Sequence, residues 1–225
     1  MKKTTRLIPS IAAFGISLGL IATTQAQQNH FYLKGDIGGT SARDVRLREF
    51  FGQAIAPNSN ISLDPGIRFG LHAGYGITDW LAGEVETGVM ANSIESITGA
   101  TVTDGSLAHI PLLLNAKFHL PNEYRVSPYV GGGFGLASTI LSGDDIIIGG
   151  TRFSGTVANA VFAYQAFAGL RVAINDRMGL SVEYHYLHTA ASNMRADLTI
   201  GTPSDRIKLG ETETHSVSVA FDFRF

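Results

Sequence analysis

The sequence predicts an all-β fold, an eight-stranded antiparallel up-and-down transmembrane β-barrel. Polar and apolar residues alternate with a period of two in eight segments of about ten residues, the length of a tilted strand across a bilayer. The connections between these segments are alternately short and long. After residue 26, no apolar run reaches the roughly 20 residues that a transmembrane helix needs.

The first 26 residues have the three-part pattern of a secretory signal peptide. The chain starts with three cations, continues with an uncharged apolar run to Ile21, and has small residues before an expected cleavage site after Ala26. The apolar run is too short for a transmembrane anchor. We therefore expect residues 1–26 to be removed and residues 27–225 to form one outer-membrane β-barrel domain.

Composition excludes several kinds of site and partner. The chain has no cysteine, so disulfides, thiolate metal sites and lipid attachment to cysteine are excluded. Three of the 17 Lys and Arg residues lie in the leader, which leaves 14 against 19 acidic residues and a net charge of −5. This mild acidity argues against nucleic acid as a partner.

The eight predicted strands follow one another with turn residues or long loops between them. They are Phe31–Gly39, Gly66–Tyr75, Leu81–Val89, Ala108–Phe118, Pro128–Leu136, Phe162–Ile174, Met178–Leu187 and His215–Phe225. Pro111 removes a donor from its strand and predicts a bulge there, because proline is disfavoured in central strands. Residues 146–148 predict a hairpin extension outside the membrane, which leaves a ten-strand count as an alternative.

The connections predict the orientation of the barrel. Residues 76–79, 121–126 and 175–177 are short turns, whereas residues 40–64, 92–106, 138–158 and 188–212 are long. Bacterial barrels have short periplasmic turns and long external loops, so both termini are expected in the periplasm. The first and last long loops each carry three basic against three acidic residues, so we expect solvated loops without a basic patch.

The polar face of each strand is expected to line the lumen. Lipid takes the apolar face of a membrane barrel, which inverts the arrangement of a soluble sandwich. The inward cations are Lys34, Arg68, Lys117, Arg171 and Arg224, and the inward anions are Asp36, Glu84, Glu86, Glu183 and Asp222. Five cations against five anions give a neutral lumen charge network. Side chains can fill an eight-stranded barrel, and long ones can lean over the inward glycines, so we expect a closed lumen.

The chain resembles the small outer-membrane β-barrel proteins of the OmpA transmembrane-domain, OmpX and opacity-protein type. The resemblance covers the whole mature chain and is carried by Pro111–Phe118, Ser127–Gly135 and Phe162–Arg171, the last followed by the turn at Asn175–Arg177. It implies location in the outer membrane, with outer-membrane lipid and lipopolysaccharide as surroundings.

The last strand is similar to the assembly signal that the outer-membrane insertion machinery reads. Phe221, Phe223 and Phe225 alternate on one face up to the final residue. The resemblance therefore implies that this machinery is a partner. Many barrels share the signal, so it indicates location more than function.

No catalytic, cofactor or metal motif stands out in the sequence. Glu183 and His185 share one strand face and are expected to form part of a lumen hydrogen-bond network. A lipid-A deacylase on a similar barrel uses an outward Ser and His; here His215 has only Ser192 or Ser216 as candidate partners. We therefore expect no enzyme, but a structural or surface-interaction protein acting through its external loops, with an unknown surface ligand. A narrow solute pore and a lipid-A-modifying enzyme are the alternatives.

Overall fold

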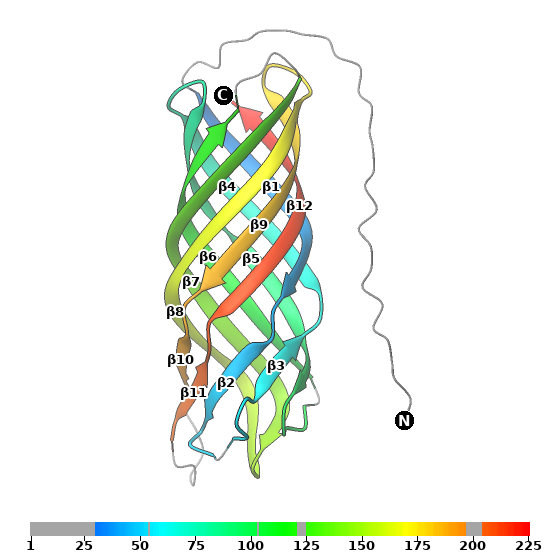
Figure 1. Ribbon diagram of the computed structural model, residues 1–225, viewed down its shortest axis with the longest axis vertical. Coiled ribbons are helices and arrows are strands. Elements are labelled where there is room, and N and C mark those ends of the chain that lie inside the picture. Colours follow the sequence, from blue (N-terminus) through cyan, green and yellow to red (C-terminus); the bar gives the residue numbers. More distant parts are fainter. Residues whose placement is uncertain (1–29, 54, 103, 121–124, 197–203) are drawn as a thin grey trace, which may run out of the picture.

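The computed structural model contains a closed ring of eight antiparallel strands, which confirms the predicted fold class (Figure 1). It describes residues 30–53, 55–102, 104–120, 125–196 and 204–225, and the expected signal peptide lies outside the described residues. The ring strands are β1 (Phe31–Ala42), β4 (Gly66–Gly76), β5 (Leu81–Ile97), β6 (Asp104–His119), β7 (Val126–Ile148), β8 (Thr151–Ala173), β9 (Met178–Thr189) and β12 (Thr212–Arg224). Each pairs with the next, and β12 pairs with β1. No helix in the described ranges is long and apolar enough to cross a membrane.

The ring strands reproduce the predicted facing. Outward positions such as Leu112 and Leu170 are exposed on the outer wall, where lipid would contact them. Inward positions such as Gln165 are buried. The bulge predicted at Pro111 is absent, because the β5–β6 register is the same at Thr87–Leu112 and at Met90–His109. Only the pairs between these two positions are missing from the ladder. One of them involves Pro111, which has no backbone N–H to donate.

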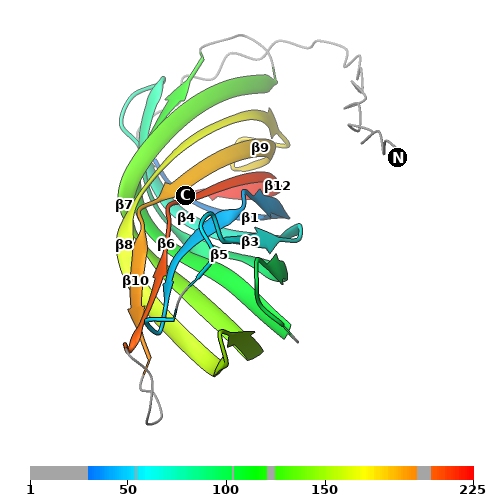
Figure 2. The same cartoon turned by 60° about the horizontal axis from the view of Figure 1, so that its bottom comes forward.

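The barrel wall continues beyond the membrane as a folded extension. The long β7–β8 hairpin reaches Ile148 and Thr151, which confirms the hairpin extension expected from residues 146–148. Four further strands form here: β2 (Val45–Phe50), β3 (Asn60–Leu63), β10 (Ser192–Arg195) and β11 (Arg206–Leu209). They are ordered β10-β11-β2-β3-β5, so the first and last long connections pair with each other (Figures 1 and 2). The expectation of solvated loops is therefore wrong for these segments.

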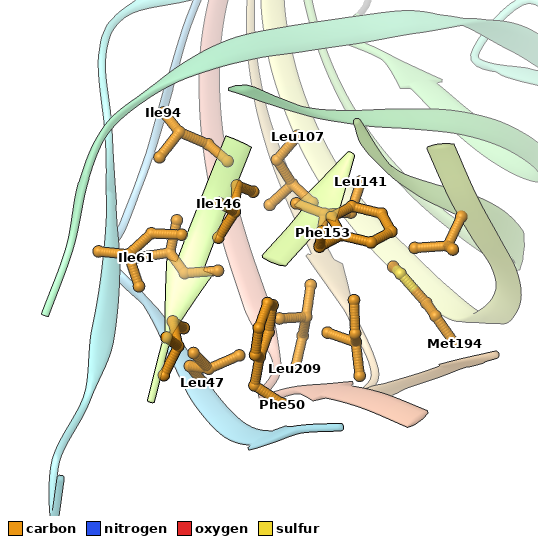
Figure 3. Packing of buried hydrophobic residues seen from close by; sticks show 14 of the residues in the cluster. Leu47, Phe50, Ile61, Ile94, Leu107, Leu141, Ile146, Phe153, Met194 and Leu209 are labelled. Carbon is orange, nitrogen blue, oxygen red and sulfur yellow. The ribbon is translucent and has the colours of Figure 1, made fainter. Parts of the chain in front are cut away.

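The polarity of the barrel interior changes along its length. Within the transmembrane part the outward side chains are mostly apolar, and the inward ones are polar apart from a belt of five apolar residues. In the extension the inward side chains are apolar and pack into a cluster that we name the external core (Figure 3). Its buried members are Val45, Leu47, Phe50, Phe51, Ile61, Ile94, Ile97, Leu107, Leu141, Ile146, Ile148, Phe153, Val157, Met194, Ile207 and Leu209. The extension is thus built like a water-soluble β-protein, with its core inside and its polar face outside.

Candidate functional site

The lumen holds all ten of the charged residues expected there. Nine of them are buried and Arg224, at the periplasmic mouth, is half-buried. They come from seven of the eight ring strands, because the inward positions of neighbouring strands meet across the narrow barrel. Three groups of contacts connect them.

The first group centres on two carboxylates near the periplasmic half. Lys117 Nζ lies 2.7 Å from Glu84 Oε1, and Lys34 Nζ lies 2.9 Å from Glu183 Oε1 and 3.8 Å from Glu84. The hydroxyl of Tyr129 donates to Glu183, and His185 Nε2 lies 2.9 Å from the same carboxylate. Two cations therefore balance two anions, as a desolvated group of charges requires.

The second group surrounds Arg68, one of the largest fully buried side chains in the described ranges. Its guanidinium donates to Asp36 at 2.8 Å and to Glu86 at 2.7 Å, so it links two carboxylates. The imidazole of His72 contacts Asp36 at 2.8 Å. Gln165 donates to Glu86 and, at 2.9 Å, to Asn115. A guanidinium suits this position because its fixed donors serve two acceptors at once.

The third group closes the periplasmic mouth. Arg171 makes two hydrogen bonds to Asp222, at 2.8 and 2.7 Å, and Arg224 lies 4.0 Å from the same carboxylate. The cavity between this group and the first has a volume of about 10 Å³. A space of that size holds no more than about one water molecule. The periplasmic entrance is therefore narrow and lined by charge.

Tyr32 is a lumen residue that the sequence reading did not single out. Its hydroxyl donates to Glu84 at 2.6 Å, and Lys117 lies over its ring. The alternation of the strand could have identified Tyr32 as inward, because it lies on the same face as Lys34 and Asp36. An aromatic next to a strand start is, however, equally typical of an outward interfacial position.

The inward glycines are covered by side chains from neighbouring strands. A Cβ on Gly74 would lie 2.2 Å from the ring of Tyr32, and a Cβ on Gly169 would lie 2.5 Å from the ring of Tyr129. Any larger residue there would displace the aromatic ring. The glycines therefore leave no open channel past these rings, in agreement with the expected leaning of large side chains.

Two apolar layers follow the charged groups toward the external end. The first is a buried set of five inward residues: Met90, Leu113, Ala137, Ala163 and Leu187. The second is the external core. A solute on the barrel axis would meet buried charge, then an apolar belt, then a packed apolar core.

Among the described residues of the outer rim, His215 is the histidine for which the sequence offered serine partners. His215 Nδ1 lies 2.6 Å from the hydroxyl of Tyr184. Ser216 points inward and donates to Thr40, and Ser192 is buried in the extension. Neither candidate serine is paired with His215. In the described ranges no group of three or more histidine or acidic residues could hold a metal ion.

The three phenylalanines of the last strand lie on the outer wall at the periplasmic end. Phe221 and Phe225 are exposed there, and the rings of Phe223 and Phe225 pack edge to face with centroids 5.3 Å apart. The backbone amide of Phe225 donates to the carbonyl of Phe31 at 2.9 Å. The last residue thus adds one hydrogen bond to the pairing of the first and last strands.

Comparison with known proteins supports the architecture. Residues 10–225 match the model of a family described as outer membrane protein beta-barrel domain. No curated protein gives a significant match. Among solved structures, Neisserial surface protein A is similar, with a TM-score of 0.54, 17% identity, and coverage of 87% of this chain and 97% of that chain.

Two further structures extend the likeness to proteins of other kinds. The outer membrane protein OprG from Pseudomonas aeruginosa has a TM-score of 0.55 and 14% identity over 87% of this chain and 96% of that chain. The outer membrane protease OmpT from Escherichia coli has a TM-score of 0.50 and 10% identity over 90% of this chain and 99% of that chain. At such identities the likeness shows the fold alone.

Proposed function

The chain belongs to the outer membrane protein β-barrel domain family and is located in the outer membrane; from this premise we propose that it is a closed, non-enzymatic barrel that presents a folded surface for interaction. One observation carries the proposal: the external connections form a strand extension with its own apolar core. Loops that only join transmembrane strands have no need of such a core. A packed extension holds surface side chains in fixed positions, as a binding surface requires.

The lumen supports the same proposal and disfavours a solute pore. Paired charges, aromatic rings over the glycines and two apolar layers occupy the barrel axis. Planar-bilayer recordings of the purified protein should therefore show no steady current. A stable, ion-selective current from the unmodified protein would overturn the closed-barrel proposal in favour of the pore.

Surface presentation has its own test. Surface biotinylation of intact cells should label Lys208 of the extension, whereas Lys34 and Lys117 of the lumen should stay unlabelled until the protein is unfolded. Labelling of the two lumen lysines in intact cells would show that the interior is open to solutes.

We also propose that the leader is cleaved after Ala26, so the mature protein should begin at Gln27 on amino-terminal sequencing.

A further inference from the structure

The outer surface of the extension carries positive charge on one side. We name as the basic face five outward side chains of β2, β10 and β11: Arg46, Arg48, Arg195, Arg206 and Lys208. Each long connection was expected to be balanced, but the pairing of β11 with β2 brings the cations of both together. Among the described acids only Glu49 and Asp205 lie within 4 Å of the basic face. Five cations and these two acids have a net charge of +3.

Other strands of the extension carry negative charge. We name as the acidic face three exposed side chains of β5, β6 and β7: Glu95, Asp104 and Asp144. Asp104 and Asp144 are direct ladder partners. Because Ser93 pairs with Ser106, Glu95 and Asp104 each lie two residues further toward the outside on their neighbouring strands. The acidic face is therefore one row of three carboxylates across three strands, with a charge of −3.

Each of the two faces contains like charges that stand directly opposite each other. Asp104 faces Asp144 in the β6–β7 ladder, and Arg195 faces Arg206 in the β10–β11 ladder. Like charges so placed destabilise a sheet. Within the part of the chain described, neither aspartate forms an ion pair, and nor does Arg195. Each face therefore has charge that a partner of opposite sign would neutralise.

The two faces lie on opposite sides of the extension and at the same level. The strands follow the order β10-β11-β2-β3-β5, which β6, β7 and β8 continue, and β10 lies beside β8 (Figure 1). Between β11, at the centre of the basic face, and β6, at the centre of the acidic face, three strands intervene in either direction. Leu47 and Ile207 on the basic side, and Ile94 and Ile146 on the acidic side, pack in the same external core. Both faces therefore stand at the height of that core.

We propose that the basic face of one copy of this protein binds the acidic face of the next copy in the same membrane. Copies inserted in one membrane share one orientation, so their extensions lie at the same height and meet side to side. The net charges of +3 and −3 are complementary, and the two like-charge pairs neutralise each other across the contact. A separate anionic ligand would satisfy the basic face alone and leave the acidic row unpaired.

The position of the faces determines the form of the assembly. A contact between two different faces leaves one face free at each end of the pair, so further copies can add. Because the faces lie on opposite sides of the extension, the contact repeats in a row and does not close into a small ring. This inference rests on the proposed interaction function and names a second copy of the chain as the partner.

The test measures energy transfer between donor-labelled and acceptor-labelled copies of the full-length protein in phosphatidylcholine vesicles. The chain has no cysteine, so D79C, in a short turn at the other end of the barrel, accepts one fluorophore on every copy. The variants R195E/R206E and D104R/D144R should each associate roughly tenfold or more weakly, because attractive contacts become repulsive. The control R125E/R177E makes the same change in net charge as R195E/R206E, at exposed arginines outside the extension, and should associate normally.

A mixture of the two variants separates a lost contact from a damaged protein. Donor-labelled R195E/R206E and acceptor-labelled D104R/D144R should show energy transfer again, because each variant keeps the face that the other has lost. Each variant also keeps like charges opposite each other in its ladder, and a heat-dependent gel shift verifies that it is a folded barrel. Salt at about 1 M should weaken the association, since the screening length falls to about 3 Å.

Three results would overturn the pairing of copies. They are absence of energy transfer in the unmodified protein, unchanged transfer in either face variant, and loss of transfer in R125E/R177E. A loss in R195E/R206E that the mixture does not restore would overturn it as well and would assign the basic face to another partner. Labelling of Lys208 on intact cells without energy transfer would overturn the pairing but leave the proposed interaction function standing.

Discussion

Arginine serves two different purposes in this protein, and burial decides which. The side chain of Arg68 is buried between Asp36 and Glu86, where neither carboxylate can regain water. The side chain of Arg43 is 70% exposed beside Glu213. Removing one partner of a buried pair leaves an uncompensated charge, whereas solvent replaces the partner of an exposed pair.

We therefore expect R68L to lower the free energy of unfolding by about 3–5 kcal/mol. R43L should lower it by about 0–1 kcal/mol. Reversible urea unfolding in lipid vesicles measures both values. Similar values for the two variants would show that water reaches the Arg68 group and that the lumen is not sealed there.

Phe225 combines a structural contact with a proposed role in assembly. We infer that the insertion machinery reads the alternating phenylalanines, of which Phe225 is the last, and that its loss also removes a hydrogen bond to Phe31. Deleting Phe225 should reduce the outer-membrane yield and leave protein in the periplasm. The variant F221A/F223A separates the loss of the assembly signal from the loss of the hydrogen bond. It removes two phenylalanines of the signal but keeps the hydrogen bond between Phe225 and Phe31, and it should also reduce the outer-membrane yield. Normal yield from both variants would remove these residues from the assembly signal.

At the level of strands, the alternation of residues predicted the transmembrane part well. All eight expected segments coincide with ring strands, apart from Ile174 and Phe225, which directly follow β8 and β12. The agreement arises because lipid and lumen impose opposite polarity on adjacent residues. The strands are longer than expected where lipid no longer contacts them: β7 was expected to end at Leu136 and continues to Ile148. Beyond the membrane the apolar side chains face inward and the polar ones outward, so the alternation expected for a lipid-facing strand no longer identifies the strand.

The short strands of the extension could not be predicted from their own sequences. Val45–Phe50 and Arg206–Leu209 are too short to be stable alone, and each becomes a strand because the other pairs with it. The same long-range pairing brings side chains of the first and last long connections together. The lumen residues, in contrast, were predictable, because the alternation of residues within a single strand shows which side chains face inward. Which cation contacts which anion was not predictable, since that depends on side chains meeting across the barrel.

The external core should be a separate unit of stability. Phe50 is buried against Phe51, with ring centroids 4.8 Å apart, and F50A should cost about 3–5 kcal/mol of packing within the extension. Limited proteolysis of intact cells should then cleave the extension rapidly while the heat-dependent gel shift of the barrel persists. The control F134A changes a residue of the lipid-facing wall and should leave the extension resistant. Loss of the gel shift in F50A would show that the two parts fold as one.

The whole molecule is a single wall of strands around two interiors of opposite character. Water would have to cross a charged interior near the periplasm and an apolar interior near the outside. A charged solute is disfavoured by the apolar core, and an apolar solute is disfavoured by the charged lumen. We therefore expect two unlike barriers in series to close the barrel more completely than either one alone.

The series arrangement can be tested by opening the barriers one at a time. E84A/R171A removes one member from each of two lumen groups, and replacing residues 190–211 by a short Gly-Ser linker removes β10 and β11 with Met194, Ile207 and Leu209 of the external core. Planar-bilayer recordings should show no steady current from either variant, because the other barrier remains. The combined variant should conduct, because it weakens the charged lumen and the external core together. A steady current from E84A/R171A alone would mean that water already passes the external core. A combined variant that keeps the gel shift and stays closed would show that the groups left in place, which include the Arg68 group and the belt around Met90 and Leu113, are a sufficient barrier.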